Sequence, residues 1–194
     1  MKRRDLNLSD LLILVADPSS YISMLLHSML RGFGSNKVVE ARNSDDVFQL
    51  LTEHRVDLLV CDVGLTPLGG LALTRALRKK ADNENRMMPI LMMSSDVRES
   101  TVKRARDAGA NMVIAKPISP SNLYDRLSWI AFNARKFVDT ATYYGPDRRF
   151  KIEGYPNGVG RRKGDASEIA AESGPALAQD DIDSLFSAVR TGQE

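Results

Sequence analysis

The 194-residue sequence predicts an α/β fold with a doubly wound, five-stranded parallel sheet, followed by a mostly disordered C-terminal tail. The main observation is the alternation of short apolar runs with segments whose apolar residues recur at helical spacing. The apolar runs lie at residues 11–16, 38–41, 58–61, 90–93 and 112–115. The first run is continuously apolar, as expected for a strand that is buried on both faces. Parallel strands joined by right-handed helical crossovers satisfy this pattern.

Helix signals fill the intervals between these runs. Residues 19–30 carry apolar side chains at helical spacing and are followed by Gly32 and Gly34, which are stop signals. Ser44 can cap the next helix. Further helices are expected near residues 71–80, 99–108 and 121–132. The predicted organisation is a domain over residues 8–136, an arginine-rich tail over 137–176 and a short amphipathic helix over 177–192.

The composition restricts the class of protein. Hydrophobic residues make up 43% and charged residues 27%, as in ordinary soluble domains. No stretch approaches the roughly 20 apolar residues of a membrane-spanning helix, so we expect a cytoplasmic protein without membrane insertion. The single cysteine, Cys61, cannot form an internal disulfide. A net charge of +2 gives no argument for DNA binding.

Polar side chains follow four of the predicted strands. Because ligands bind beyond the carboxyl ends of parallel strands, we expect these side chains to meet at one edge of the sheet. They are Asp17, Asp62, Ser94 and Lys116. Two carboxylates, a hydroxyl and an ammonium suit an aspartyl-phosphate site, where a divalent cation and a lysine neutralise phosphoryl oxygens. The alternative is a set of polar strand ends that face solvent.

On these residues, the chain over about 11–132 resembles the response-regulator receiver family, in which CheY is the closest architectural relative. The resemblance implies a flavodoxin-like signalling domain, not an enzyme, with a sensor kinase as a partner. It implies that Asp62 is the phosphoacceptor and that Ser94 and Lys116 contact the phosphoryl group. It also implies a cis peptide at Lys116-Pro117, and Mg²⁺ held by Asp17, Asp62 and the carbonyl of Gly64.

The sequence departs from the family pattern at three places. Ala16-Asp17 stands where the family has two adjacent acids, Val113 replaces the aromatic switch residue, and Pro67 lies one place later than usual. The loss of a carboxylate weakens the expected Mg²⁺ binding and slows the expected phosphorylation.

The tail repeats one arrangement, an arginine pair beside an aspartate among glycines and prolines. Few aliphatic residues occur there, so the segment is expected to be mostly disordered or to fold on binding. Arginine binds phosphate and the O6/N7 edge of guanine in bidentate fashion, and aspartate can accept from the N–H groups of guanine. A ligand with two guanines and two phosphates, cyclic di-GMP, fits both halves. The candidate residues are Tyr143, Tyr144, Gly145, Pro146, Asp147, Arg148, Arg149, Gly160, Arg161, Arg162 and Asp165.

This stretch resembles the arginine-rich, cyclic-di-GMP-binding segment of the Cle (CheY-like) proteins of α-proteobacteria. The resemblance implies cyclic di-GMP as the ligand, flagellar motor or switch proteins as partners, and recruitment to the flagellar pole. The alternatives for the tail are a solvated linker and a nonspecific polyanion-binding patch.

The last predicted element is an amphipathic helix whose apolar stripe consists of Ile182, Leu185, Phe186 and Val189. It resembles the N-terminal peptide of the flagellar switch protein FliM, which docks on CheY. The resemblance implies docking on its own receiver domain or on another one, and the alternative is an ordinary helix packed on the domain.

Three functional hypotheses follow. The leading one is a cyclic-di-GMP effector that acts on the flagellar motor, motility or surface attachment. The second is a phosphorylation-controlled single-domain response regulator whose tail only tethers a partner. The third is a structural adaptor that ignores both ligands and uses the terminal helix.

Overall fold

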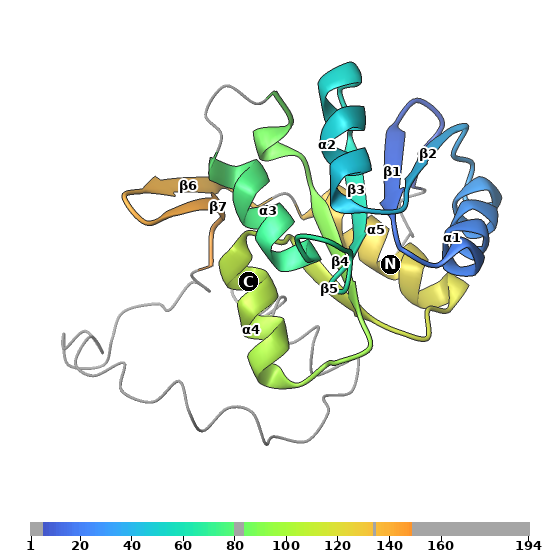
Figure 1. Cartoon of the computed structure of the whole chain (residues 1–194). Helices are drawn as coiled ribbons and strands as arrows, with labels where there is room; N and C mark the ends of the chain where they lie inside the picture. Colours follow the sequence, from blue (N-terminus) through green and yellow to red (C-terminus); the bar gives the residue numbers. More distant parts are fainter. Residues whose placement is uncertain (1–5, 80–83, 134, 149–194) are drawn as a thin grey trace, which may run out of the picture.

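The computed structural model describes residues 6–79, 84–133 and 135–148. The predicted parallel sheet is confirmed, with the strand order β2-β1-β3-β4-β5 (Figure 1). Its strands are β1 (Leu12–Ala16), β2 (Lys37–Ala41), β3 (Leu58–Asp62), β4 (Ile90–Ser94) and β5 (Met112–Ala115). All neighbouring pairs in this sheet run parallel. The strand order places β1 and β3 at the centre, so their carboxyl ends lie side by side.

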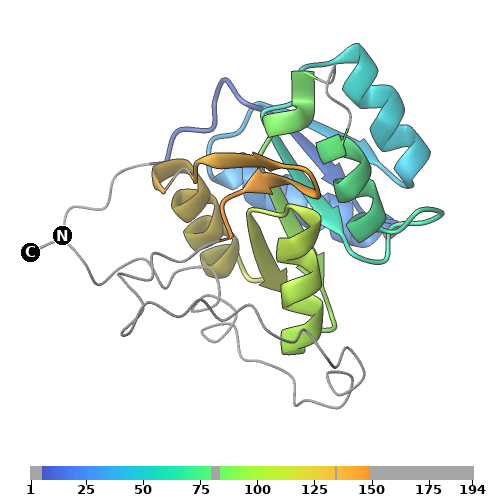
Figure 2. The same cartoon turned by 90° about the vertical axis from the view of Figure 1, so that its left-hand side faces the viewer.

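Helices cover both faces of the sheet (Figures 1 and 2). They are α1 (Ser20–Gly32), α2 (Ser44–Glu53), α3 (Gly70–Lys79), α4 (Glu99–Ala108) and α5 (Pro120–Phe132), with a short 3₁₀ turn, η1, at Glu84–Met87. The predicted cap of α2 was wrong by one residue, because the side chain of Asn43 accepts from the Asp46 N–H. The Ser44 hydroxyl instead accepts from the backbone N–H of Leu68 and so fixes the loop after β3.

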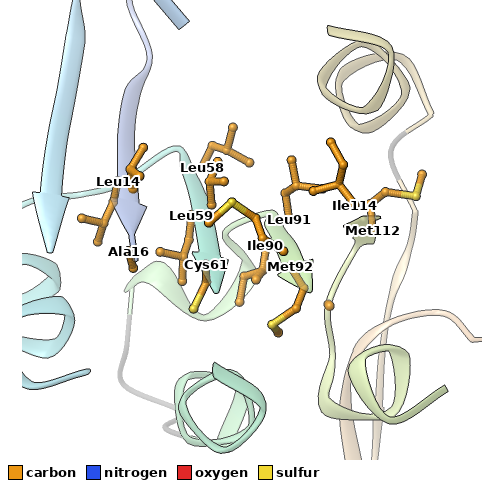
Figure 3. Packing of buried hydrophobic residues seen from close by; sticks show 14 of the residues in the cluster. Leu14, Ala16, Leu58, Leu59, Cys61, Ile90, Leu91, Met92, Met112 and Ile114 are labelled. Atoms are coloured by element: carbon orange, nitrogen blue, oxygen red, sulfur yellow. The ribbon is translucent and has the colours of Figure 1, made fainter. Parts of the chain in front are cut away.

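The core lies between the sheet and the two helical layers. Leu59 on β3 and Ile90, Leu91 and Met92 on β4 are fully buried (Figure 3). Ile13 and Met93 are fully buried as well. Cys61 belongs to this layer and is fully buried as a free thiol. Burial raises the pKa of the Cys61 thiol strongly, and the nearby carboxylates of Asp62 and Asp17 raise it further.

A β-hairpin that the sequence did not predict follows α5. β6 (Phe137–Thr140) pairs antiparallel with β7 (Tyr143–Pro146), and the hairpin lies beside the C-terminal end of α4 (Figure 2). Isolated two-stranded hairpins are marginal in water, so this one depends on its contacts with the domain. Residues 149–194, which include the second half of the arginine motif and the terminal amphipathic segment, lie outside the described residues.

Over the described ranges, no helix combines the length and the apolar character that a membrane crossing requires.

Candidate functional sites at the sheet edge and the hairpin

The predicted strand-end residues meet at the carboxyl edge of the sheet. Asp17 follows β1, Asp62 ends β3 and Lys116 follows β5. The Lys116 ammonium donates to Asp17 Oδ2 at 2.7 Å and also forms an ion pair with Asp62 Oδ2. Asp17 and Asp62 are 1% and 8% exposed, so the single lysine is the counter-ion of two nearly buried carboxylates.

The protonation of Lys116 reflects this setting. Burial lowers the pKa of Lys116, but the hydrogen bonds to Asp17 and then Asp62 act in the opposite direction, and the net pKa lies above its usual value. The lysine is therefore firmly charged at neutral pH. Its peptide bond to Pro117 is cis, as the family resemblance implied.

The Ser94 hydroxyl lies at the same edge but is bonded to the loop that follows it. Its Oγ donates to the Asp96 carbonyl at 2.7 Å and accepts from the Asp96 N–H at 3.1 Å. The Ser94 carbonyl accepts from the Lys116 N–H at 2.8 Å, so the serine and the lysine occupy adjacent strand ends. In this arrangement the backbone of Asp96 occupies the Ser94 hydroxyl both as acceptor and as donor.

The oxygen atoms at this edge suit a hard divalent cation such as Mg²⁺. The Oδ1 atoms of Asp17 and Asp62 accept from the N–H groups of Ser19 and Gly64 at 2.8 and 2.7 Å, and these bonds orient both carboxylates. A Cβ on Gly64 would lie 2.9 Å from Asp62 Oδ1, so only glycine lets the loop approach this closely. Within the described ranges no group of three acidic, histidine or cysteine side chains converges. The side-chain oxygen donors at this edge are the carboxylates of Asp17 and Asp62.

The first half of the arginine motif forms a second candidate site, at the hairpin. Arg148 donates to Asp107 Oδ1 on α4 at 2.9 Å, and its guanidinium carbon lies 3.9 Å from the centre of the Tyr143 ring. Tyr143 is buried, and its hydroxyl donates to the Pro146 carbonyl at 2.8 Å. The N–H of Asp147 donates to the Lys136 carbonyl. The structure thus brings Tyr143, Asp147 and Arg148 together.

Two arginines of the domain hold the hairpin in place. The Arg86 guanidinium stacks on the Tyr144 ring at 3.3 Å, and Arg78 lies 5.1 Å from the centre of the Phe137 ring. Arg78 is 2% exposed and donates to the carbonyls of Gly109 and Arg86. Burial lowers its pKa to about 10. A charged side chain this deeply buried requires such partners, which makes it a structural anchor.

Sequence reasoning missed Arg86 and Asp107, which contact the predicted ligand residues Tyr144 and Arg148, and Arg78, which contacts Phe137 of the hairpin. The one available signal was an arginine on the apolar face of the helix that begins after Gly70. Gly145 is also buried, and a Cβ there would lie 2.5 Å from the Tyr143 hydroxyl and 3.2 Å from the Gly109 Cα. Its role is therefore close packing against the domain. Arg149, Gly160, Arg161, Arg162 and Asp165 lie outside the described residues.

A parallel sheet in this strand order, with an Asp–Asp–Lys cluster at its carboxyl edge, is typical of a CheY-like signalling domain. Residues 13–128 match the family described as the response regulator receiver domain. The chain therefore belongs to the response-regulator receiver family.

Known proteins similar to this chain include whole regulators and parts of larger ones. The chemotaxis protein CheY homolog of Campylobacter jejuni is 31% identical over 116 residues, which cover 59% of this chain and 88% of that protein. The sensory/regulatory protein RpfC of Xanthomonas campestris is 28% identical over 130 residues, which cover 67% of this chain. The matched region spans only 18% of the length of RpfC.

Solved structures agree on the fold. A response regulator from Chloroflexus aurantiacus superposes with a TM-score of 0.58 at 29% identity, covering 63% of this chain and 98% of its own. The receiver domain of the sensor histidine kinase PA1611 from Pseudomonas aeruginosa gives a TM-score of 0.56 at 24% identity, covering 63% of this chain and 99% of its own. In that structure a magnesium ion is coordinated in the active site cleft.

Proposed function

We propose that this receiver-family protein is a cyclic-di-GMP effector that acts in chemotaxis or motility. The observation that carries the proposal is the arrangement at the hairpin, where a guanidinium, an aromatic ring and an aspartate lie on consecutive parts of one short segment. Arginine and tyrosine can hold a guanine by stacking and hydrogen bonding, and arginine binds phosphate. Asp147 can accept from the N–H groups of guanine. The second Arg–Arg–Asp half, over residues 160–165, would serve the other guanine.

The similarity to chemotaxis regulators supports the biological setting. The relative in Campylobacter jejuni carries chemotaxis in its name and is matched over most of its length. On this basis the partners are flagellar motor or switch proteins, and the site of action is the cytoplasmic side of the flagellar pole. The segment with Ile182, Leu185, Phe186 and Val189 would supply a docking helix for a receiver domain, its own or another.

The test is a calorimetric titration of the full-length protein with cyclic di-GMP. We expect micromolar or tighter binding that the Arg148→Ala/Arg149→Ala variant loses by about 100-fold, since each charge-assisted hydrogen bond contributes roughly 1.5–3 kcal/mol. The matched control is Arg75→Ala/Arg104→Ala, which removes the same charge from exposed positions on α3 and α4. Absence of binding in the wild-type protein, or equal losses in both variants, would contradict the proposal.

A second candidate function is phosphorylation of Asp62 with Mg²⁺ as the cofactor and a sensor kinase as the donor. It is favoured by the Lys116 ammonium, which is placed to neutralise a phosphoryl oxygen on Asp62. The carboxylates of Asp17 and Asp62 and the carbonyl of Gly64 would hold the cation, which would neutralise the incoming phosphoryl oxygens. Incubation with acetyl phosphate and Mg²⁺, read by intact-protein mass, should add one phosphoryl group to the wild type and none to Asp62→Asn.

A further inference from the structure

A cavity of about 760 Å³ lies between the C-terminal half of α4 and the hairpin. Small-molecule sites in proteins fall in the range of roughly 300–1,000 Å³. Its charged and aromatic lining comes from both elements and consists of Arg106, Asp107, Asp139, Tyr143, Asp147 and Arg148. Three of these belong to the proposed nucleotide-binding segment, and the two on α4 do not. The receiver domain therefore forms one wall of the space in front of the arginine motif.

Arg106 is unusual among the groups on that wall. Its Nε is buried and, over the described ranges, has no hydrogen-bond acceptor. The anion nearest to it is Asp107 Oδ1, at 3.6 Å from Nε, beyond hydrogen-bond distance. A buried donor without an acceptor is costly, so a ligand oxygen that reached this atom would gain a full charge-assisted bond.

The single carboxylate of Asp107 faces two guanidinium groups. Its Oδ1 accepts from Arg148 at 2.9 Å, which leaves Arg106 with the longer contact. The charge of Arg106 also acts on Arg135. Burial lowers the pKa of Arg135, and the nearby guanidinium of Arg106 lowers it further. The lining holds three carboxylates and two guanidinium groups, but Asp139 pairs with Arg86, and Asp107 pairs with Arg148. Arg106 is therefore the cation on this wall that a ligand oxygen can engage.

From these contacts we propose that the nucleotide site extends onto the receiver domain. Arg106 is a binding residue for a phosphate or guanine oxygen of cyclic di-GMP, and Asp107 is the internal anion that the ligand displaces from Arg148. The inference rests on the proposed function and deepens it, because it makes α4 part of the sensor. Ligand binding would then change the contacts at the C-terminal end of that helix.

The experiment is a titration of full-length variants with cyclic di-GMP under the conditions used for the wild type. Arg106→Ala should bind at least about tenfold more weakly, since the loss of one charge-assisted bond is worth about that factor. The affinity of Arg106→Lys should lie between those of the wild type and Arg106→Ala, because lysine keeps the charge but lacks the planar guanidinium that can form two parallel hydrogen bonds. Arg104→Ala, two residues away and exposed, is the matched control and should bind as the wild type does.

Asp107→Asn should change the affinity for cyclic di-GMP in the opposite direction. It removes the anion that engages Arg148, so binding should tighten, by about three- to tenfold. Thermal midpoints of all variants check that each is folded, and two-dimensional NMR of the wild type should place ligand-induced shifts on α4 as well as on the hairpin.

The outcomes separate this inference from the function on which it rests. If the wild type binds and Arg106→Ala binds equally well, the extension onto α4 is wrong and the tail alone is the sensor. Weaker binding by Asp107→Asn would contradict the role of Asp107 as a competitor. If the wild type does not bind cyclic di-GMP, the proposed function fails and this inference fails with it.

Discussion

The sheet edge and the junction between α4 and the hairpin both gather charged side chains, but the carboxylates of the first are nearly buried and that of the second is exposed. At the sheet edge one lysine, Lys116, serves two carboxylates, so the site has an excess of negative charge. At the junction Arg106 and Arg148 share the carboxylate of Asp107, and Arg148 also stacks on the Tyr143 ring. The first site therefore offers carboxylate oxygens, and the second offers guanidinium donors.

Helix α4 connects the two regions. It begins at Glu99, after the loop in which Asp96 bonds the Ser94 hydroxyl. It ends at Ala108, so Asp107 lies in its last turn, next to the hairpin. Three changes test how independent the regions are, one at the anchor of the hairpin, one within it and one in the loop before α4.

The largest effect is expected from Arg78→Met. The change removes donors to the buried carbonyls of Gly109 and Arg86 and the stacking partner of Phe137. Because buried acceptors left unpaired cost roughly 1–3 kcal/mol each, the free energy of unfolding should fall by about 3 kcal/mol. Urea unfolding measures this, with Arg75→Met on the exposed side of α3 as the control. A loss below that of the control would show that the anchor is dispensable.

A smaller, local effect is expected from Gly145→Ala. The added Cβ would lie 2.5 Å from the Tyr143 hydroxyl and 3.2 Å from the Gly109 Cα, so the Tyr143 side chain and the packing on Gly109 must both adjust, at a cost of roughly 1–3 kcal/mol. Hydrogen exchange should increase in β6 and β7, whereas phosphorylation of Asp62 by acetyl phosphate should be unchanged. Gly32→Ala is the control, because its Cβ would meet no atom of the described residues within 4 Å. A parallel loss of phosphorylation would show that the two regions are coupled.

The smallest effect is expected at Asp96, in the loop that precedes α4. Hydrogen bonds, the largest from the Arg98 side chain and a further one from Thr101, lower the pKa of Asp96 below its usual 3.8, although burial acts against them. The unfolded chain therefore takes up a proton first as the pH falls, so this stabilisation is present above about pH 4 and is lost below it. Solvent screening of the 42% exposed side chain limits the effect to about 0.5 kcal/mol.

Urea midpoints of the wild type and Asp96→Asn should differ at pH 6 and converge near pH 2.5. Asp125→Asn, at an exposed position on α5, is the control. If the two midpoints still differ at pH 2.5, the charge of the Asp96 carboxylate is not the source of the stabilisation.

The sheet edge could be predicted from the sequence and the junction only in part, for physical reasons. Asp17, Asp62 and Lys116 each follow an apolar run, and the parallel topology alone brings strand ends together. The hairpin has no comparable local signal, since Phe137 to Pro146 is rich in residues that also suit an irregular tail. Its order comes from Arg78, Arg86 and Gly109, which are distant in sequence. The orientation of Ser94 toward Asp96 was likewise a loop property that no periodicity encodes.

The buried thiol of Cys61 has a practical consequence. It is the only cysteine in the chain, it is fully buried, and burial beside two carboxylates keeps it protonated. Thiolate is the reactive form, so maleimide reagents will leave the folded protein unlabelled. A single cysteine introduced at the hairpin turn, for example Thr142→Cys, can therefore carry a fluorophore without any background substitution. The native chain therefore needs no cysteine removal before such a reporter is attached.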